Sequence, residues 1–218
     1  PGIIISAISD GLVERGHEVD LFAPSDSRTK ANLISYGSSV YSNYKELNNK
    51  NQMSFNDLIA EDELNMYSQS INVIKKGNYD IINAHNYRRL MYFSDFLDQP
   101  IIYTYHGNPL EDIINDIDKR RAKRFYKNNL FIAISKRQKE IGKKYFNFID
   151  VIPHGVDIVK YKFSNNYEEK LLFLGRIIER KGPDIAIKAA KNTNMPLIIV
   201  GQESTDKQNR IYFERKIS

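Results

Sequence analysis

Short apolar runs alternate with amphipathic stretches along most of the chain. The clearest runs are VDLFA at 19–23, DIINA at 80–84, IIYTY at 101–105 and LFIAI at 130–134. Strands of a parallel sheet with helices on both faces are buried on both sides, so they read as short apolar runs between helical patterns. The pattern therefore predicts an α/β fold with a doubly wound parallel sheet in the first part of the chain.

Glycine and proline punctuate this pattern where the predicted elements end. Gly16 and Gly77 follow the first two helical stretches, while Pro100 and Pro153 lie at strand edges, where a missing amide hydrogen is tolerated. Residues 24–57 are rich in Ser and Asn and have weak periodicity. We expect a long loop there, with at most one short strand at 39–44.

A second unit is predicted after the polar stretch SNNYEEK at 164–170. Its pattern is a strand, a basic loop, a helix from about Pro183 to Asn192, a strand at 197–201 and a last helix. We expect a first domain over 1–160 and an incomplete second domain over 166–218. Residue 1 is proline and 211–218 keeps helical spacing to the last residue, so we also expect both ends to be cut and the first domain to lack its first strand.

The composition narrows the class of protein. The 218 residues are 41% hydrophobic and 27% charged, as in ordinary soluble domains, and they include no cysteine. A disulfide framework and a thiolate metal site are therefore excluded, and a reducing compartment is favoured. No apolar run approaches the ~20 residues that a membrane span needs, and no signal peptide is visible. We expect a cytoplasmic protein.

The stretch KLLFLGRIIERKG at 170–182 is the most informative one, because cations gather where an apolar strand ends. Arg176, Arg180 and Lys181 are offset locally by Glu179 alone. Open α/β sheets hold phosphate groups at such strand-to-helix loops, where helix amides and cations both favour anions. The stretch predicts a diphosphate site at Arg176 and Lys181, with a solvated loop as the alternative.

Two histidines occupy positions where parallel sheets hold their ligands. His106 follows the strand at 101–105 and precedes Gly107, and His85 follows the strand at 80–84. Both are predicted at carboxyl ends of parallel strands. We expect His106 to act in the site and His85 to support it, against the alternative of histidines that only bond to nearby backbone. His17, in a helix-to-strand turn, is expected to be structural.

Four motifs carry a resemblance to a known family. GRIIERKG at 175–182, PHGVD at 153–157, TYHG at 104–107 and LVERGHEV at 12–19 resemble the retaining glycosyltransferase family 4, in the family's order. The resemblance implies the GT-B arrangement, in which two Rossmann-like domains face each other across a cleft. The domain at 1–160 would then lie on the acceptor side, and the one at 166–218 would be the start of the nucleotide-sugar-binding domain.

The resemblance also implies a reaction and residue roles. A hexosyltransferase-type enzyme would move a sugar from a nucleoside-diphosphate sugar to an acceptor hydroxyl, with retention and without a metal or other cofactor. His106 would lie close to the reacting sugar and acceptor, with His85 on the acceptor side. Gly175, Arg176 and Lys181 would bind the donor diphosphate, and Gly2 would be what remains of a glycine-rich loop near it.

The chain departs from the family's pattern in three places. One glycine and no acid stand in PGIIIS, where the family usually has two glycines and often a glutamate. His154 stands where the family most often has asparagine, which keeps a polar group. The family's E-x7-E pair, which binds the donor sugar and ribose, would come after the last residue. The expected activity is therefore that of the parent enzyme.

Other charged groups suggest partners. The pair Asp116 and Asp118 has metal-motif spacing but lies in a helical stretch, so we expect a solvated helix face and no metal site.

Residues 119–144 hold eleven Lys or Arg and one acid. They favour peripheral contact with an anionic membrane and a carbohydrate or lipid-linked acceptor, as in polysaccharide or glycolipid biosynthesis, or else form a solvated face. Nucleic acid is disfavoured, because no recognition motif accompanies the charge.

Two other functions remain open at this point. A GT-B epimerase acting on a nucleotide-sugar would need several carboxylates near the sugar, which the motif loops lack. A non-catalytic binding module, or a remnant of an enzyme, is the alternative from another class.

Overall fold

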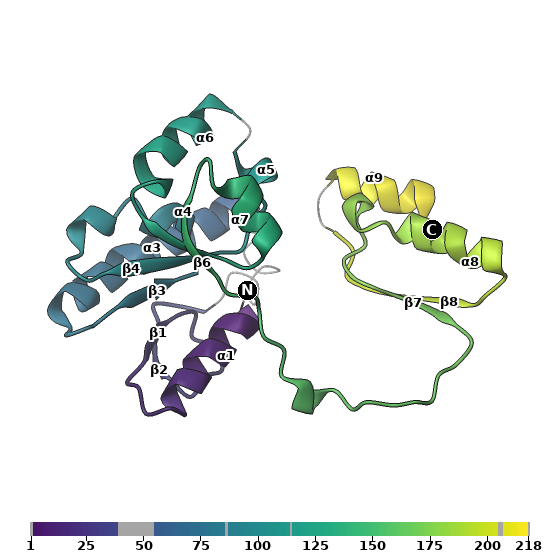
Figure 1. Cartoon of the computed structure of the whole chain (residues 1–218), viewed down its shortest axis with the longest axis horizontal. Coiled ribbons are helices and arrows are strands. Elements are labelled where there is room, and N and C mark those ends of the chain that lie inside the picture. The colour runs from purple at the N-terminus through teal and green to yellow at the C-terminus, as the bar shows by residue number, and fades with distance from the viewer. Residues whose placement is uncertain (1, 39–54, 86, 114, 205–206, 218) are drawn as a thin grey trace. The chain divides into compact units, whose positions relative to one another are not determined.

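The computed structural model describes residues 2–38, 55–85, 87–113, 115–204 and 207–217 (Figure 1). The chain divides into two compact units, Pro1–Val156 and Asp157–Ser218. We call them the first and the second unit and describe each by itself.

The first unit contains two parallel sheets. The larger has the order β3-β4-β5-β6 and pairs Ala84 with Tyr103 and Tyr105 with Ala133. In the smaller sheet β1 lies parallel to β2. The strands are β1 (Asp20–Phe22), β2 (Asn32–Ile34), β3 (Ile82–Ala84), β4 (Ile101–Tyr105), β5 (Leu130–Ala133) and β6 (Asn147–Val151). All pairs are parallel, so the predicted α/β class is confirmed.

Helices connect these strands. They are α1 (Gly2–Val13), α3 (Phe55–Lys76), α4 (Tyr87–Leu90), η1 (Ser94–Phe96), α5 (Pro109–Asp112), α6 (Asp116–Arg121), η2 (Ala122–Tyr126) and α7 (Lys136–Gly142). Gly16 ends the turn after α1 at φ 87°, and the amide of His17 donates to the carbonyl of Leu12 at 3.1 Å. This bond is the closing contact of a Schellman motif, so the predicted role of Gly16 is confirmed.

The long loop predicted at 24–57 is wrong in two places. Asn32–Ile34 forms β2, and α3 begins at Phe55. The strand β2 has three residues and is defined by its bonds to β1, which a Ser- and Asn-rich composition does not reveal. The strand expected at 39–44 lies outside the described residues.

The core of the first unit is aromatic around β4, β5 and β6. Tyr105, Tyr126, Phe131 and Phe146 are almost fully buried. The ring of Phe146 stacks on Tyr126 with a centroid distance of 4.7 Å and meets Phe131 edge-on at 5.1 Å. Such aromatic pairs stabilise by burial and by ring geometry. They fix the position of β4, whose carboxyl end leads to His106.

The second unit has the predicted order of strand, loop, helix, strand and helix. Its elements are η3 (Ile158–Lys160), β7 (Leu171–Leu174), η4 (Glu179–Lys181), α8 (Pro183–Thr193), β8 (Leu197–Val200) and α9 (Lys207–Lys216). The strands β7 and β8 are parallel and pair Leu171 with Leu197. Leu172 and Leu174 alternate with less exposed residues, as expected for a sheet covered on one face.

We predict that Phe131→Ala lowers the free energy of unfolding by about 3–5 kcal/mol, because it removes a fully buried ring from its contacts with the rings of Tyr103, Tyr126, Phe146 and Phe148. Denaturant unfolding followed by circular dichroism measures the change. Phe96→Ala is the control, since Phe96 is 60% exposed, and it should cost less than about 1 kcal/mol. Equal losses in both variants would contradict the assignment of the core.

Candidate active site

Three histidines meet at the carboxyl edge of the larger sheet. His85 follows β3, His106 follows β4 and His154 lies beyond β6. Because β3 to β6 are parallel, their carboxyl ends lie along one edge and their following loops converge there. We call these three residues the histidine cluster.

His106 is the centre of the histidine cluster. Its Nε2 lies 2.9 Å from Nδ1 of His85, and its Nδ1 lies 3.1 Å from Nε2 of His154. The rings stack, with centroid distances of 5.2 Å and 4.9 Å. A neutral imidazole has one donor and one acceptor nitrogen, so three neutral rings can form both contacts as a chain of two hydrogen bonds.

The environment favours the neutral form of His85 and His106. Burial lowers the pKa of His85 to about 4, and the neighbouring His154 adds to this effect. Burial also lowers the pKa of His106 to about 4, together with the repulsion that a second positive imidazole would cause. At neutral pH, His106 therefore presents a hydrogen-bonding group without charge.

The nitrogens of the histidine cluster point at one another in pairs and do not converge on a common point. Within the described ranges, no three His, Cys, Asp or Glu side chains are arranged to hold a metal ion.

A buried glutamine holds the loop that carries His106. Gln138 Nε2 donates to the carbonyl oxygens of Tyr105 at 3.1 Å and Gly107 at 2.8 Å, the two residues that flank His106. Its Oε1 accepts from the amide of Ile134 at 2.7 Å. Gln138 is 6% exposed, so these bonds are shielded from water and fix the backbone on both sides of the histidine.

The sequence reasoning missed Gln138, although a local signal was present. Ser135 and Gln138 have the S-x-x-Q spacing of a capping box at the start of α7. Ser135 does cap the helix, accepting from the amide of Gln138 at 3.0 Å. The side chain of Gln138, however, turns to the loop after β4 instead of reaching back to Ser135, and only the folded chain shows that.

Gly107 is required by the close approach of two side chains. Tyr105 donates its hydroxyl to Asp112 Oδ2 at 2.6 Å, directly over the glycine. A Cβ at position 107 would lie 2.1 Å from that carboxylate oxygen and 2.9 Å from the tyrosine hydroxyl. The sequence TYHG therefore reflects a packed loop in which glycine leaves space for the Tyr105–Asp112 bond.

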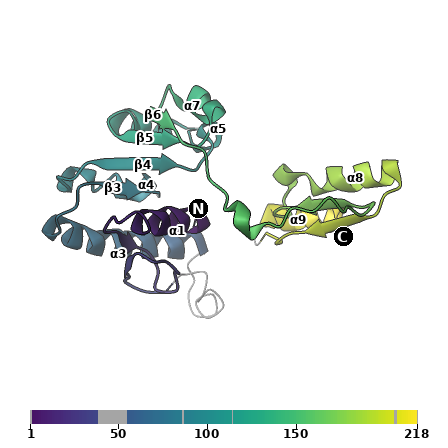
Figure 2. The ribbon, with the colours of Figure 1, turned by 60° about the horizontal axis from the view of Figure 1, so that its bottom comes forward.

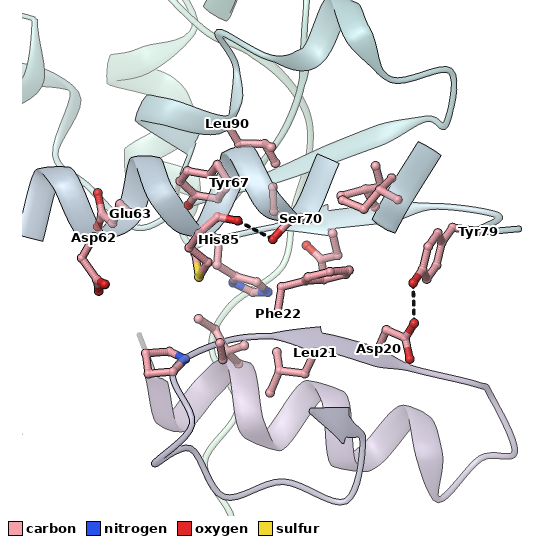
Figure 3. Close-up of a pocket in the computed structure, with 18 of the residues that line it drawn as sticks. Asp20, Leu21, Phe22, Asp62, Glu63, Tyr67, Ser70, Tyr79, His85 and Leu90 are labelled. Atoms are coloured by element: carbon pink, nitrogen blue, oxygen red, sulfur yellow. Dashed lines mark hydrogen bonds between the residues drawn. The ribbon is translucent and has the colours of Figure 1, made fainter. Parts of the chain in front are cut away.

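A cavity of about 370 Å³ lies beside the histidine cluster, and His85 is part of its lining (Figure 3). Most of the lining is apolar and comes from α1, β1, α3 and β3. Three acids also line it: Glu63 forms an ion pair with Arg89, burial raises the pKa of Asp62, and Asp20 accepts a hydrogen bond from the Tyr79 hydroxyl. The cavity is therefore mostly apolar, and it extends to His85 at the carboxyl edge of the larger sheet.

The basic loop of the second unit is held by its backbone and by two buried side chains. Ile177 and Ile178 are each 8% exposed, and the amide of Ile177 donates to the carbonyl of Gln202 at 3.0 Å. Gly201 lies against Gly175 so closely that a Cβ would be 1.8 Å from the Gly175 carbonyl oxygen. These contacts fix the main chain on either side of Arg176.

The cations of this loop are available for a ligand. Arg176 and Lys181 are exposed, and within the described part of the chain their side chains form no ion pair or hydrogen bond. At the start of α8, Gly182 has φ 69° and is followed by Pro183 and Asp184. Asp184 accepts from the Tyr212 hydroxyl at 2.5 Å, which lowers the pKa of its carboxyl.

Asp184 bears on the expectation that both the helix amides and the cations of this loop favour an anion. A carboxylate in the first turn already complements the positive end of the helix dipole. The amides at the start of α8 therefore already face a carboxylate, whereas Arg176 and Lys181 of the loop are exposed.

Other predicted site residues are placed without a distinctive contact. Gly2 is the first residue of α1, and a Cβ there would meet nothing within 4 Å, so close packing does not require glycine. Asp116 and Asp118 lie at the start of α6, where they pair with Lys119 at 3.1 Å and Arg121 at 3.3 Å. These pairs neutralise part of the basic stretch. Membrane contact through that stretch stays a prediction.

One protein-family model matches the part of the chain that contains the histidine cluster. The model described as Glycosyltransferase Family 4 matches residues 2–160, which include the histidine cluster and Gln138 but not the basic loop. No curated protein gives a significant match to the chain. No described helix is long and apolar enough to span a bilayer. Because the match covers most of the chain and the sheets are parallel with connecting helices, the chain belongs to glycosyltransferase family 4 and has the α/β, Rossmann-like fold of the GT-B type.

Proposed function

We propose that the protein transfers a sugar from a nucleoside-diphosphate sugar to an acceptor hydroxyl, with retention and without a bound metal ion. The observation that carries the proposal is the pair of exposed cations, Arg176 and Lys181, on a loop fixed by buried Ile177 and Ile178. As the bond to the sugar breaks, negative charge develops on the leaving diphosphate. Fixed cations stabilise that charge more in the transition state than in the ground state, typically by a few kcal/mol per group.

We assign His106 a hydrogen-bonding role toward the substrates. Both of its ring nitrogens contact neighbouring imidazoles, so a substrate hydroxyl must replace one of them. His154 is exposed whereas His85 is partly buried, so the contact with His154 costs less to break. Substrate is then expected at Nδ1 of His106, while His85 and Gln138 keep the ring and its loop in place.

The acceptor is proposed to be a carbohydrate or a lipid-linked sugar, bound on the side of His85. An epimerase or a pure binding module would use the same cations for the diphosphate. Product analysis separates the three: transfer gives a free diphosphate and a glycosylated acceptor, epimerisation gives an isomer of the donor, and a binding module leaves the donor unchanged.

We predict that Arg176→Ala and Lys181→Ala each weaken the binding of nucleoside diphosphates at least tenfold, since each removes a charge-assisted contact to phosphate. Isothermal titration calorimetry with uridine, guanosine and adenosine diphosphates measures the affinities. Lys191→Ala, an exposed cation on α8 away from the loop, is the matched control and should bind as the unmodified chain does. Unchanged affinity in both loop variants would contradict the diphosphate assignment.

For His106→Ala we expect sugar transfer to fall about 100-fold or more, while diphosphate affinity changes by less than about threefold. The reason is that His106, which belongs to the first unit, is proposed to contact the reacting groups, whereas the proposed phosphate cations belong to the second unit. Turnover of a bound nucleotide-sugar, followed as diphosphate release, measures the effect. His17→Ala, in the exposed turn after α1, serves as the control. Loss of diphosphate binding in His106→Ala would contradict this role.

The low pKa values of His85 and His106 predict an acid-sensitive fold. Between pH 6.5 and pH 4 the unfolded chain binds protons that His85 and His106 do not bind in the folded chain, so the free energy of unfolding falls as the pH falls through this range. NMR titration should show His106 protonating near pH 4 in the folded protein and near 6.5 in urea. His106→Gln should make unfolding less dependent on pH between 4 and 6.5. A folded His106 that titrates near 6.5 would contradict the lowered pKa of its imidazole.

A further inference from the structure

We propose that the backbone amides of His106 and Asn108 bind hydroxyl oxygens of the acceptor sugar, and that Gln138 directs these amides toward it. The inference rests on the proposed function, because it places part of the acceptor on the loop after β4. It gives the acceptor a chemical class, a polyhydroxyl group without charge, and it gives Gln138 a positioning role.

The amides that follow β4 have no partner within the protein. Among the residues that the structure describes, the backbone N–H groups of His106, Gly107 and Asn108 donate to no carbonyl and to no side chain. The strand β3 ends at Ala84, which pairs with Tyr103, so no described strand lies beside this part of the loop on that side. The three residues are partly exposed, and their free donors are therefore available to a ligand.

Gln138 determines the direction of two of these amides. Its Nε2 donates to the carbonyl oxygens of Tyr105 at 3.1 Å and Gly107 at 2.8 Å, so both carbonyls point to one nitrogen. In a planar trans peptide unit the N–H group points opposite to the carbonyl group, and both of these units are trans. The N–H groups of these two units are those of His106 and Asn108. Both therefore point away from Gln138.

The direction away from Gln138 is the direction of His85. Gln138 Oε1 accepts from the amide of Ile134 at 2.7 Å, and Ile134 directly follows β5. Figure 2 shows β4 between β3 and β5 in the larger sheet. The side opposite to Gln138 is thus the side of β3, whose carboxyl end leads to His85. This is the side on which the acceptor is proposed to bind.

The short helix α5 does not supply this site. Asn108 precedes the helix, and its Oδ1 accepts from the amide of Leu110 at 3.1 Å. The carbonyl of Asn108 accepts from the amides of Glu111 and Asp112, each at 2.9 Å. The first amides of α5 are therefore already bonded, and the two free donors belong to the loop.

The charges beside the loop favour neutral hydroxyl groups over an anion. Glu111 Oε1 accepts from Asn108 Nδ2 at 2.9 Å, and Asp112 Oδ2 accepts from the Tyr105 hydroxyl at 2.6 Å. Both carboxylates would repel a phosphate or carboxylate group at the loop. The lowered pKa of His106 leaves its ring neutral at neutral pH, so it adds no compensating charge. A neutral hydroxyl oxygen accepts from an N–H group without this repulsion.

NMR titration of the chain tests the two amides directly. The probes are the methyl α-glycosides of glucose, galactose and mannose, and inorganic phosphate is the anionic alternative. We expect a methyl glycoside to shift the amide resonances of His106 and Asn108, and we expect phosphate to shift neither. The amides of β6, Asn147–Val151, are the internal reference because they lie in a strand that already pairs with β5.

The variant Gln138→Glu tests the positioning role. It keeps an acceptor for the amide of Ile134 but loses both donors, and its carboxylate repels the carbonyls of Tyr105 and Gly107. The dissociation constant of the glycoside should rise at least tenfold, since both amides lose their direction. Ser135→Ala is the matched control, because it removes the cap of α7 and leaves the loop bonds in place. It should change the dissociation constant by less than about threefold.

Three results would overturn the proposal. They are no shift of either amide with any of the three glycosides, shifts with phosphate alone, and equal glycoside affinity in the unmodified chain and Gln138→Glu. The titration of the unmodified chain decides on the amides even if Gln138→Glu does not fold. No nucleotide enters the titration, so its failure is distinct from a failure of the diphosphate prediction for Arg176 and Lys181.

Discussion

The parallel alignment of β3 to β6 determines where the three imidazoles of the histidine cluster meet. Parallel pairing brings the carboxyl ends of these strands to one edge, and three loops deliver an imidazole there. An antiparallel neighbour would have sent one of these loops to the opposite edge. The contacts of 2.9 Å and 3.1 Å around His106 therefore depend first on the parallel direction of the strands. The local sequence around each histidine has a smaller part in them.

The loop after β4 shows how that edge becomes rigid enough to position a ring. Gln138 bonds the carbonyls on both sides of His106, and the Tyr105–Asp112 bond closes the same loop from the other side. The buried aromatic rings beneath it hold β4 in place. A catalytic group needs this kind of support, since a ring that moves by about 1 Å loses much of its effect.

The sequence allowed much of the fold to be predicted, because strands buried on both faces have an unmistakable composition. The strand β4 matches the predicted run at 101–105 residue for residue, and the second unit has the predicted order of elements. The placement of His85 and His106 followed from the same reasoning. The strand β2 was missed because its three residues are held by pairing with β1, and Gln138 was missed because its bonds join residues more than 30 positions apart. Proximity of His154 to His106, 48 positions away, likewise depends on packing that no local pattern encodes.

Gly107 has an evolutionary consequence as well as a geometric one. The absence of a Cβ there makes room for the Tyr105–Asp112 bond, so the three positions share one small space. A larger residue at 107 becomes acceptable only if position 105 or 112 changes at the same time, and either of those changes alone loses a partly buried hydrogen bond. Substitutions at these positions are therefore coupled, and a lineage can leave the present combination only through intermediates that fold less well than either end state.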